Sequence, residues 1–246
     1  MQGYTQDYLL DKQVKIYQPI NGYRASTDAI MVSSLVHNVK NRDNILDVGS
    51  GTGAISLCLA SRFKDKNPHI VGLELQPELA KLSNMSADAN GFSDILHYHN
   101  HNIKNKADFI IPNSFQHVIS NPPYTDHDMP SPNPSKAMAH NHSDCDLSEW
   151  IAFCIKMLAP KGMLYMINRA EAIDEILFSL YGKMGGIKLI PLFTKSSEKA
   201  KRIMVIAQKA SKAPTTILPD FIVHSENTYT QKAHRILRGG MSFFEA

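Results

Sequence analysis

One stretch decides the fold: Asn44-Ile45-Leu46-Asp47-Val48-Gly49-Ser50-Gly51-Thr52-Gly53. Its first half is apolar and predicts a buried strand that ends near Asp47. Its second half carries three alternating glycines, and a helical pattern over residues 54–63 follows. Glycine has no side chain, so a ligand can approach the backbone closely at such a turn. A strand, a glycine-rich turn and a helix in this order predict a binding loop at the carboxyl edge of a sheet.

A second predicted strand, residues 69–74, ends in Glu74, about twenty residues past Gly53. An acid at this spacing typically binds the two ribose hydroxyls of an adenosine cofactor. The spacing alone leaves a dinucleotide and other adenosine ligands open. Asp47, directly before the glycines, favours a cofactor that carries an amino acid, because a carboxylate would repel a pyrophosphate.

A third motif follows the apolar strand predicted over residues 116–119: Asn121-Pro122-Pro123-Tyr124. The two prolines fix the backbone and prevent the strand from continuing. The Asn121 side-chain oxygen and the Pro122 carbonyl are acceptors for the two hydrogens of a flat amino group, and Tyr124 offers a face on which a base can stack. The motif predicts a corner that holds an exocyclic amine or an amide. An ordinary Pro-Pro turn is the simpler alternative.

The rest of the chain alternates between strand and helix patterns. Residues 1–22 predict a short arm with a strand over residues 14–17, and Thr27 or Asp28 is the expected N-cap of a helix over residues 29–36. Further helices are expected at 77–90, 147–158, 171–184 and 229–237, and further strands at 94–101, 162–167, 187–193, 203–207 and 221–224. This order predicts a single domain over residues 1–246, a three-layer α/β/α sandwich with a seven-stranded, mostly parallel sheet of Rossmann-like type.

Composition excludes several classes of protein. The 246 residues are 43% hydrophobic, enough for one α/β domain, and the net charge of +3 is not diagnostic. Three scattered cysteines without a C-x-x-C pair indicate reduced thiols, so we expect a cytoplasmic protein. We expect neither a signal peptide nor a membrane span, because no apolar run approaches ~20 residues. A monomer is expected.

Three polar features need interpretation. His97, His99 and His101 alternate on one strand face, but no cysteine or carboxylate completes a metal site, so no metal is expected. Basic residues around the strand at 203–207 fit either a solvated rim or an RNA contact. The long polar loop at 125–144 fits a lid over a substrate.

Taken together, the glycine loop, Glu74 and the Asn-Pro-Pro-Tyr corner resemble the motifs of class I S-adenosylmethionine-dependent methyltransferases that modify amino groups. Residues 23–28 and the tail at 221–237 extend the resemblance to the bacterial tRNA (adenine-N6)-methyltransferases, which act on adenine 37 of a valine tRNA. The resemblance implies an N-methyltransferase with a tRNA substrate.

The resemblance also implies roles for individual residues. Asn121, Pro122 and Tyr124 are the implied catalytic residues, and Pro123, Tyr124, Lys136 and His140 the implied substrate-binding residues. S-adenosyl-L-methionine is the implied cofactor, bound by Thr27, Asp47, Gly49, Ser50, Gly51, Gly53, Glu74, Leu75, Asn102, Ile103 and Asn121.

Two positions depart from the family's pattern. The family tends to have an acid where this chain has Asn102, and its loop after the corner usually carries arginines, where this chain has Lys136, His140 and His142.

A ribosomal RNA amine and a protein glutamine amide are alternative substrates. An inactive cofactor-binding RNA partner is an alternative of another class, and a nicotinamide dehydrogenase fits least because no Arg/His pair for hydride chemistry is evident.

Overall fold

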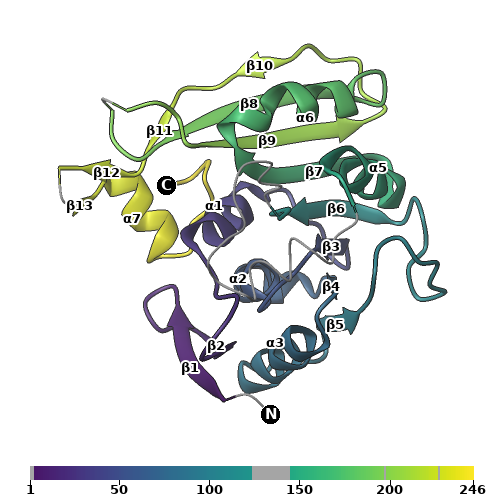
Figure 1. Ribbon diagram of the computed structural model, residues 1–246, viewed down its shortest axis with the longest axis vertical. Helices are drawn as coiled ribbons and strands as arrows, with labels where there is room; N and C mark the ends of the chain where they lie inside the picture. The colour runs from purple at the N-terminus through teal and green to yellow at the C-terminus, as the bar shows by residue number, and fades with distance from the viewer. Residues whose placement is uncertain (1–2, 124–144, 197, 227) are drawn as a thin grey trace.

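A central sheet with helices on both faces organises the chain (Figure 1). The computed structural model describes residues 3–123, 145–196, 198–226 and 228–246. Helices α1 (Thr27–Leu35), α2 (Ala54–Phe63), α3 (Pro77–Ala89) and α7 (Gln231–Leu237) share one apolar core, and α5 (Leu147–Met157) and α6 (Ile173–Leu180) share another. Neighbouring residues of one strand face opposite layers, since Ile45 belongs to the first core and Leu46 to the second. The predicted three-layer sandwich is therefore confirmed.

Seven long strands form the sheet in the order β5-β4-β3-β6-β7-β9-β8. They are β3 (Asn44–Val48), β4 (His69–Glu74), β5 (Leu96–Asn100), β6 (Phe115–Ser120), β7 (Leu158–Arg169), β8 (Met184–Phe193) and β9 (Arg202–Lys209). Only the pairings of β9 with β7 and β8 are antiparallel among these described strands. The register places Val48 opposite both Leu73 and Ser120, so the strand ends that carry the three motifs lie level.

Short elements extend this arrangement. Strands β10 (Thr216–Ile217) and β11 (Phe221–Ile222) pair in parallel with β8, and β12 (His224–Ser225) pairs with β13 (Thr228–Tyr229) as a separate ribbon. The strand predicted over residues 221–224 is thus divided between two sheets. Two single-turn helices, η1 (Lys64–Lys66) and η2 (Ala170–Ala172), complete the described elements.

The N-terminal arm is a hairpin of β1 (Tyr4–Leu9) and β2 (Val14–Pro19). Its inner residues Val14 and Ile16 are fully buried in the core that α1 and α2 share. Two backbone groups bind α3 as well: Tyr17 N donates to Ser86 Oγ at 2.8 Å, and Lys15 N donates to the Asn90 side chain at 2.9 Å. The arm is therefore a packed part of the fold.

Two local predictions need correction. The N-cap of α1 is Ser26, and Thr27 is already the first helical residue; Asp28 instead binds Arg202 on β9 at 2.9 Å. The helix predicted over residues 171–184 is shorter, because Gly182 has φ +72° and the chain enters β8 at Met184. Within the described residues, no helix combines the length and the apolar character needed to cross a bilayer.

A buried histidine lies between two polar partners in the middle of the sheet. His117 Nε2 lies 3.3 Å from Asp43 Oδ2, and His117 Nδ1 lies 3.3 Å from the Tyr165 hydroxyl. A neutral ring that donates to Asp43 and accepts from Tyr165 satisfies both contacts. Burial lowers the pKa of His117, and the hydrogen bond to Asp43 opposes this effect only in part.

Acid should therefore weaken the fold through His117. Its folded pKa lies below the ordinary value of 6.5, so the unfolded chain binds more protons as the pH falls through about 6.5, and stability drops there. Between pH 7.5 and 5.5, we expect the melting temperature of His117→Gln to fall by less than that of the wild type. A difference of about 1 kcal/mol corresponds to roughly 2–4 °C at this size. His97→Gln, at an exposed position on β5, is the matched control; equal acid sensitivity of His117→Gln and wild type would contradict the assignment.

Candidate active site at the carboxyl edge of the sheet

The glycine-rich loop follows β3 and leads into α2. Gly49, Gly51 and Gly53 all have positive φ, at 74°, 57° and 85°, a region that residues with side chains rarely adopt. Gly49 N and Ser50 N donate to the Leu73 carbonyl at 2.9 and 2.8 Å, which ties the loop to the end of β4. The alternating glycines of the sequence are thus required by the backbone conformation of this turn.

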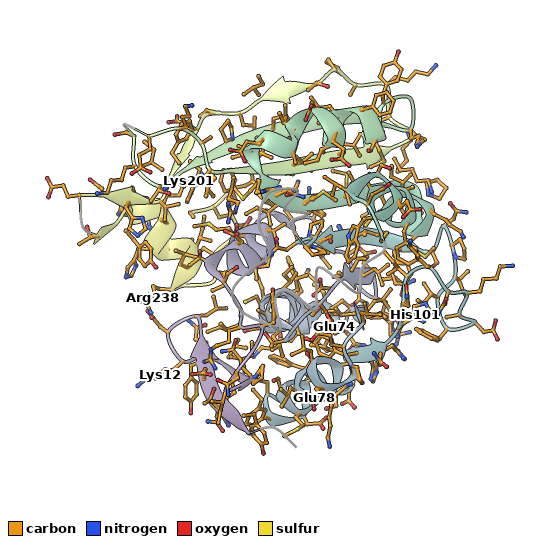
Figure 2. All side chains as sticks on the ribbon, viewed as in Figure 1. Lys12, Glu74, Glu78, His101, Lys201 and Arg238 are labelled. Carbon is orange, nitrogen blue, oxygen red and sulfur yellow. The ribbon has the colours of Figure 1, made fainter. Side chains whose placement is uncertain are left out.

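Glu74 fastens the loop to the neighbouring strand. One carboxylate oxygen accepts a hydrogen bond from Gly51 N at 2.8 Å, and the other accepts one from Gln76 N at 2.8 Å. Glu74 is buried, with an exposed fraction of 6%, and lies near the middle of the view in Figure 2. Each carboxylate oxygen can accept more than one hydrogen bond, so capacity for ribose hydroxyls remains.

Asp47 is a second buried acid beneath the same loop. Its Oδ2 accepts a 2.5 Å hydrogen bond from the Ser56 hydroxyl, while its Oδ1 has no partner among the described residues. Burial, opposed by the Ser56 hydrogen bonds and aided by the charge of Glu74, raises the pKa of Asp47 to about 7. Burial likewise raises the pKa of Glu74. Two carboxylates that are costly to ionise alone favour a cationic ligand beside them.

Three aromatic side chains pack directly on the glycines. A β-carbon at Gly51 would lie 2.5 Å from the Tyr23 ring, and one at Gly49 would lie 2.8 Å from the Trp150 ring; Tyr98 crowds Gly53 in the same way. The Tyr98 hydroxyl also donates to the Gly53 carbonyl at 3.0 Å. Burial, with the charges of the nearby acids, raises the pKa of Tyr23 to about 12, so this phenol stays neutral.

The Asn-Pro-Pro corner lies directly after β6, level with the loop. Ser120, which precedes it, is fully buried; its hydroxyl donates to the Val48 carbonyl at 2.8 Å and accepts from the Trp150 indole N–H at 2.9 Å. Asn121 and Pro123 are half-buried and Pro122 is buried. Because the Trp150 ring also packs on Gly49, one side chain holds the corner and the loop in a fixed relation.

Of the other predicted site residues, some lie beside the loop and others lie elsewhere or outside the described residues. Leu75 follows Glu74 with 36% of its surface exposed, as an apolar platform beside a ligand requires. The Asn102 side chain accepts from Lys104 N at 3.0 Å and so closes a local turn, and Ile103 packs against the second core. Thr27 lies in the wall of a different cavity, beside the arm. Tyr124, Lys136 and His140 lie outside the described residues.

Sequence reasoning missed the residues that shape the loop from outside. Tyr23, Tyr98 and Trp150 each fill space that a glycine leaves open, and Asn100 donates to the Leu75 carbonyl at 2.7 Å, which fixes the chain just after Glu74. Trp150 is the single tryptophan of the chain, but its place in the helix that begins after Asp146 did not indicate a contact with the loop.

Two of the three alternating histidines, His99 and His101, contact the ring of Phe109. His99 stacks on Phe109 with ring centroids 4.2 Å apart, and His101 meets the edge of the same ring at 5.4 Å. Burial lowers the pKa of His99. In the part of the chain that the structure describes, no cluster of histidine, cysteine and acidic residues is arranged to hold a metal ion.

Comparison with known proteins decides the family. The model of the methyltransferase small domain matches residues 26–187, which include the loop, Glu74 and the corner. The chain belongs to the methyltransferase small domain family. It is therefore a methyltransferase, and the predicted cofactor, S-adenosyl-L-methionine, is confirmed with the family.

Individual relatives agree with this assignment. The chain is 26% identical to a tRNA1(Val) (adenine(37)-N6)-methyltransferase of Actinobacillus pleuropneumoniae, covering 85% of this chain and 86% of the relative. It is also 26% identical to the enzyme of that name from Dyadobacter fermentans, covering 89% of this chain and 90% of the relative. A crystal structure of a predicted O-methyltransferase from Agrobacterium tumefaciens has the same fold, with a TM-score of 0.71 at 23% identity over 87% of this chain and 97% of that one.

The loop has the groups that this cofactor needs. Asp47 Oδ1 is an unpartnered buried acceptor for a cationic amine, and the hydroxyls of Ser50 and Thr52 are likewise buried without partners among the described residues. Glu74 retains acceptor capacity for ribose hydroxyls. The residues present therefore fit S-adenosyl-L-methionine.

Cofactor affinity should rise with pH. The cationic cofactor favours ionised Asp47, whose pKa in the free protein is about 7. At pH 6 the acid is about nine-tenths protonated, so we expect an apparent Kd about tenfold weaker than above pH 8. Quenching of Trp150 fluorescence during titration measures this, because its ring packs on Gly49. Asp47→Asn should bind more weakly and without this pH dependence; a wild-type Kd that stays constant from pH 6 to 8 would sink the idea.

Glu74 should contribute both a ligand contact and loop rigidity. We expect Glu74→Gln to weaken cofactor binding at least tenfold, because one amide oxygen replaces two charged acceptors of the Gly51 and Gln76 N–H groups. Isothermal titration with S-adenosyl-L-methionine measures the loss. Glu78→Gln, in the first turn of α3, is the matched control. Wild-type affinity in Glu74→Gln would remove the ribose assignment.

Proposed function

We propose that the chain transfers a methyl group to the exocyclic amine of an adenine in tRNA, at N6 of adenine 37 beside the anticodon. The observation that carries this proposal is the corner at Asn121 and Pro122, which Trp150 holds next to the glycine loop through Ser120 and Gly49. The names of the curated relatives support the tRNA substrate and the position.

The corner suits an amine nucleophile. The Asn121 side-chain oxygen and the Pro122 carbonyl accept the two N6 hydrogens, which directs the nitrogen lone pair away from both acceptors. The cofactor supplies an activated sulfonium methyl group. The two acceptors also stabilise the positive charge that develops on nitrogen. A strong general base is not needed, because the methylated nitrogen is acidic until it loses a proton.

Alignment carries most of the catalysis in this proposal. Holding the amine and the methyl group in line can supply up to ~7–11 kcal/mol of the barrier reduction. Two prolines fix the corner, and the buried Ser120 hydroxyl fixes the strand end beneath it. Tyr124 would stack on the target base. The adenine must first leave its stack, which costs least in a loop such as the anticodon loop.

Methyl transfer to tRNA tests the proposal directly. Labelled S-adenosyl-L-methionine is incubated with unmodified total tRNA, and the nucleosides are analysed; N6-methyladenosine that maps to position 37 is the expected product. No transfer to tRNA, with intact cofactor binding, would replace tRNA by ribosomal RNA or a protein glutamine as the substrate.

Asn121→Ala should separate catalysis from cofactor binding. We expect turnover to fall by about 10²-fold, the typical cost of removing one transition-state hydrogen bond, and cofactor affinity to stay within twofold. Asn105→Ala, at an exposed loop position, is the control. Unchanged turnover in Asn121→Ala would exclude this asparagine from the reaction.

A further inference from the structure

A cavity of about 590 Å³ lies between the tip of the arm, the start of α1 and the end of α7. We propose that it binds one nucleotide of the RNA substrate, a neighbour of the nucleotide that is methylated. This inference rests on the proposed RNA substrate. The lining of the cavity includes Tyr8, Lys12, Thr27, Tyr229 and Arg238.

The walls are suited to a nucleobase. Tyr8 and Tyr229 line the cavity from the two ends of the chain, and Leu9, Leu10, Ile30 and Leu237 supply apolar surface. Both rings are held by neighbours: the Tyr8 hydroxyl accepts from the Gln6 amide at 2.8 Å, and Tyr229 stacks on His224 with centroids 4.9 Å apart. Aromatic rings fixed in this way are stacking platforms that accept any base.

The rim is suited to a phosphate. Lys12 and Arg238 are its two cations and Asp11 is its one acid, so the lining residues carry a net positive charge. Figure 2 shows Lys12 and Arg238 extending from the same side of the molecule. Arg238 contacts Asp11 at 3.3 Å, an ion pair with about half of each side chain exposed. Such an exposed pair is weak, so a phosphate can readily take the place of Asp11.

The turn that carries Asp11 and Lys12 is strained. Leu10, Asp11 and Lys12 have positive φ in succession, at 51°, 49° and 69°, although none is glycine. Left-handed backbone is unfavourable for such residues and usually occurs singly. Leu10 is buried against Gly240, where an added β-carbon would lie 2.9 Å from the Leu10 side chain, and this packing holds the turn in place. Strain kept by packing is typical of functional sites.

The cavity and the glycine loop are joined by one short segment. Tyr23 lies on Gly51, and Thr27, four residues later, is in the cavity wall. The Cα atoms of these two residues can be no more than about 14 Å apart, the reach of four extended residues. A few nucleotides of single-stranded RNA span this distance. This proximity to the cofactor loop favours a nucleotide near the target as the occupant of the cavity.

Binding of a fluorescein-labelled anticodon stem-loop, followed by anisotropy, tests the pocket. We expect Tyr8→Ala and Tyr229→Ala each to weaken RNA binding about tenfold, with cofactor affinity unchanged by Trp150 fluorescence. Tyr4→Ala is the matched control, because Tyr4 lies on the same hairpin with 44% of its surface exposed, against 46% for Tyr8, and does not line the cavity. The control should bind RNA as the wild type does.

Lys12→Asn separates an RNA contact from a structural role. Asparagine tolerates left-handed backbone better than lysine, so the melting temperature should hold or rise. RNA affinity should nevertheless fall, with a shallower dependence on salt, because one phosphate contact is lost. A purely structural turn would leave RNA affinity unchanged.

The two proposals can fail separately. If the wild type methylates and binds the stem-loop, while Tyr8→Ala, Tyr229→Ala and Lys12→Asn bind it equally well, the pocket inference is overturned and the proposed function stands. If the wild type binds cofactor but neither methylates nor binds RNA, the proposed function is overturned and the pocket inference with it.

Discussion

The site depends on the carboxylate of Glu74. This one side chain accepts hydrogen bonds from Gly51 in the loop after β3 and from Gln76 after its own strand, so it joins two strand ends that the sheet alone only places side by side. The loop conformation needs such a tie, because three glycines with positive φ have many alternatives and would otherwise be free to adopt them. The aromatic rings that pack on the glycines hold the loop in the same form.

The same acid creates an electrostatic cost. Burial makes ionisation of both Glu74 and Asp47 harder, and the charge of Glu74 adds to this effect at Asp47. The folded pKa of Asp47 lies above its unfolded value, so the protonated acid is the form that suits the fold. Asp47 therefore favours the folded state at low pH, and this contribution is lost as the pH rises through about 7. A cationic ligand removes the conflict. The protein with an empty site is thus less stable than the protein with a bound cationic ligand. An ordinary part of the core needs no ligand to offset its buried charges.

Much of this was predictable from the sequence, for a physical reason. Strand, turn and helix follow one another locally around the glycine loop. Glu74 ends an apolar strand and Asn121 directly follows another, so the fold class and the motif positions were predicted correctly. The contacts that bind the motifs together were not. Trp150 lies 30 residues from Ser120, and the pattern of its own helix gives no indication of the ring that packs on Gly49. The antiparallel placement of β9 and the true N-cap of α1 likewise depend on tertiary packing.

The tail of the chain closes the structure over its beginning. Phe243 N donates to the Ser34 carbonyl at 2.9 Å, and Leu10 packs against Gly240, so segments more than 200 residues apart complete one core. During synthesis the arm and α1 emerge first and must wait for these partners while the sheet assembles. Helix α2 and strands β6 and β7 can cover much of α1 early, but the part of α1 that packs against α7 is covered only after the tail has been synthesised. A chain released early would have its glycine loop but lack this part of the cover over α1.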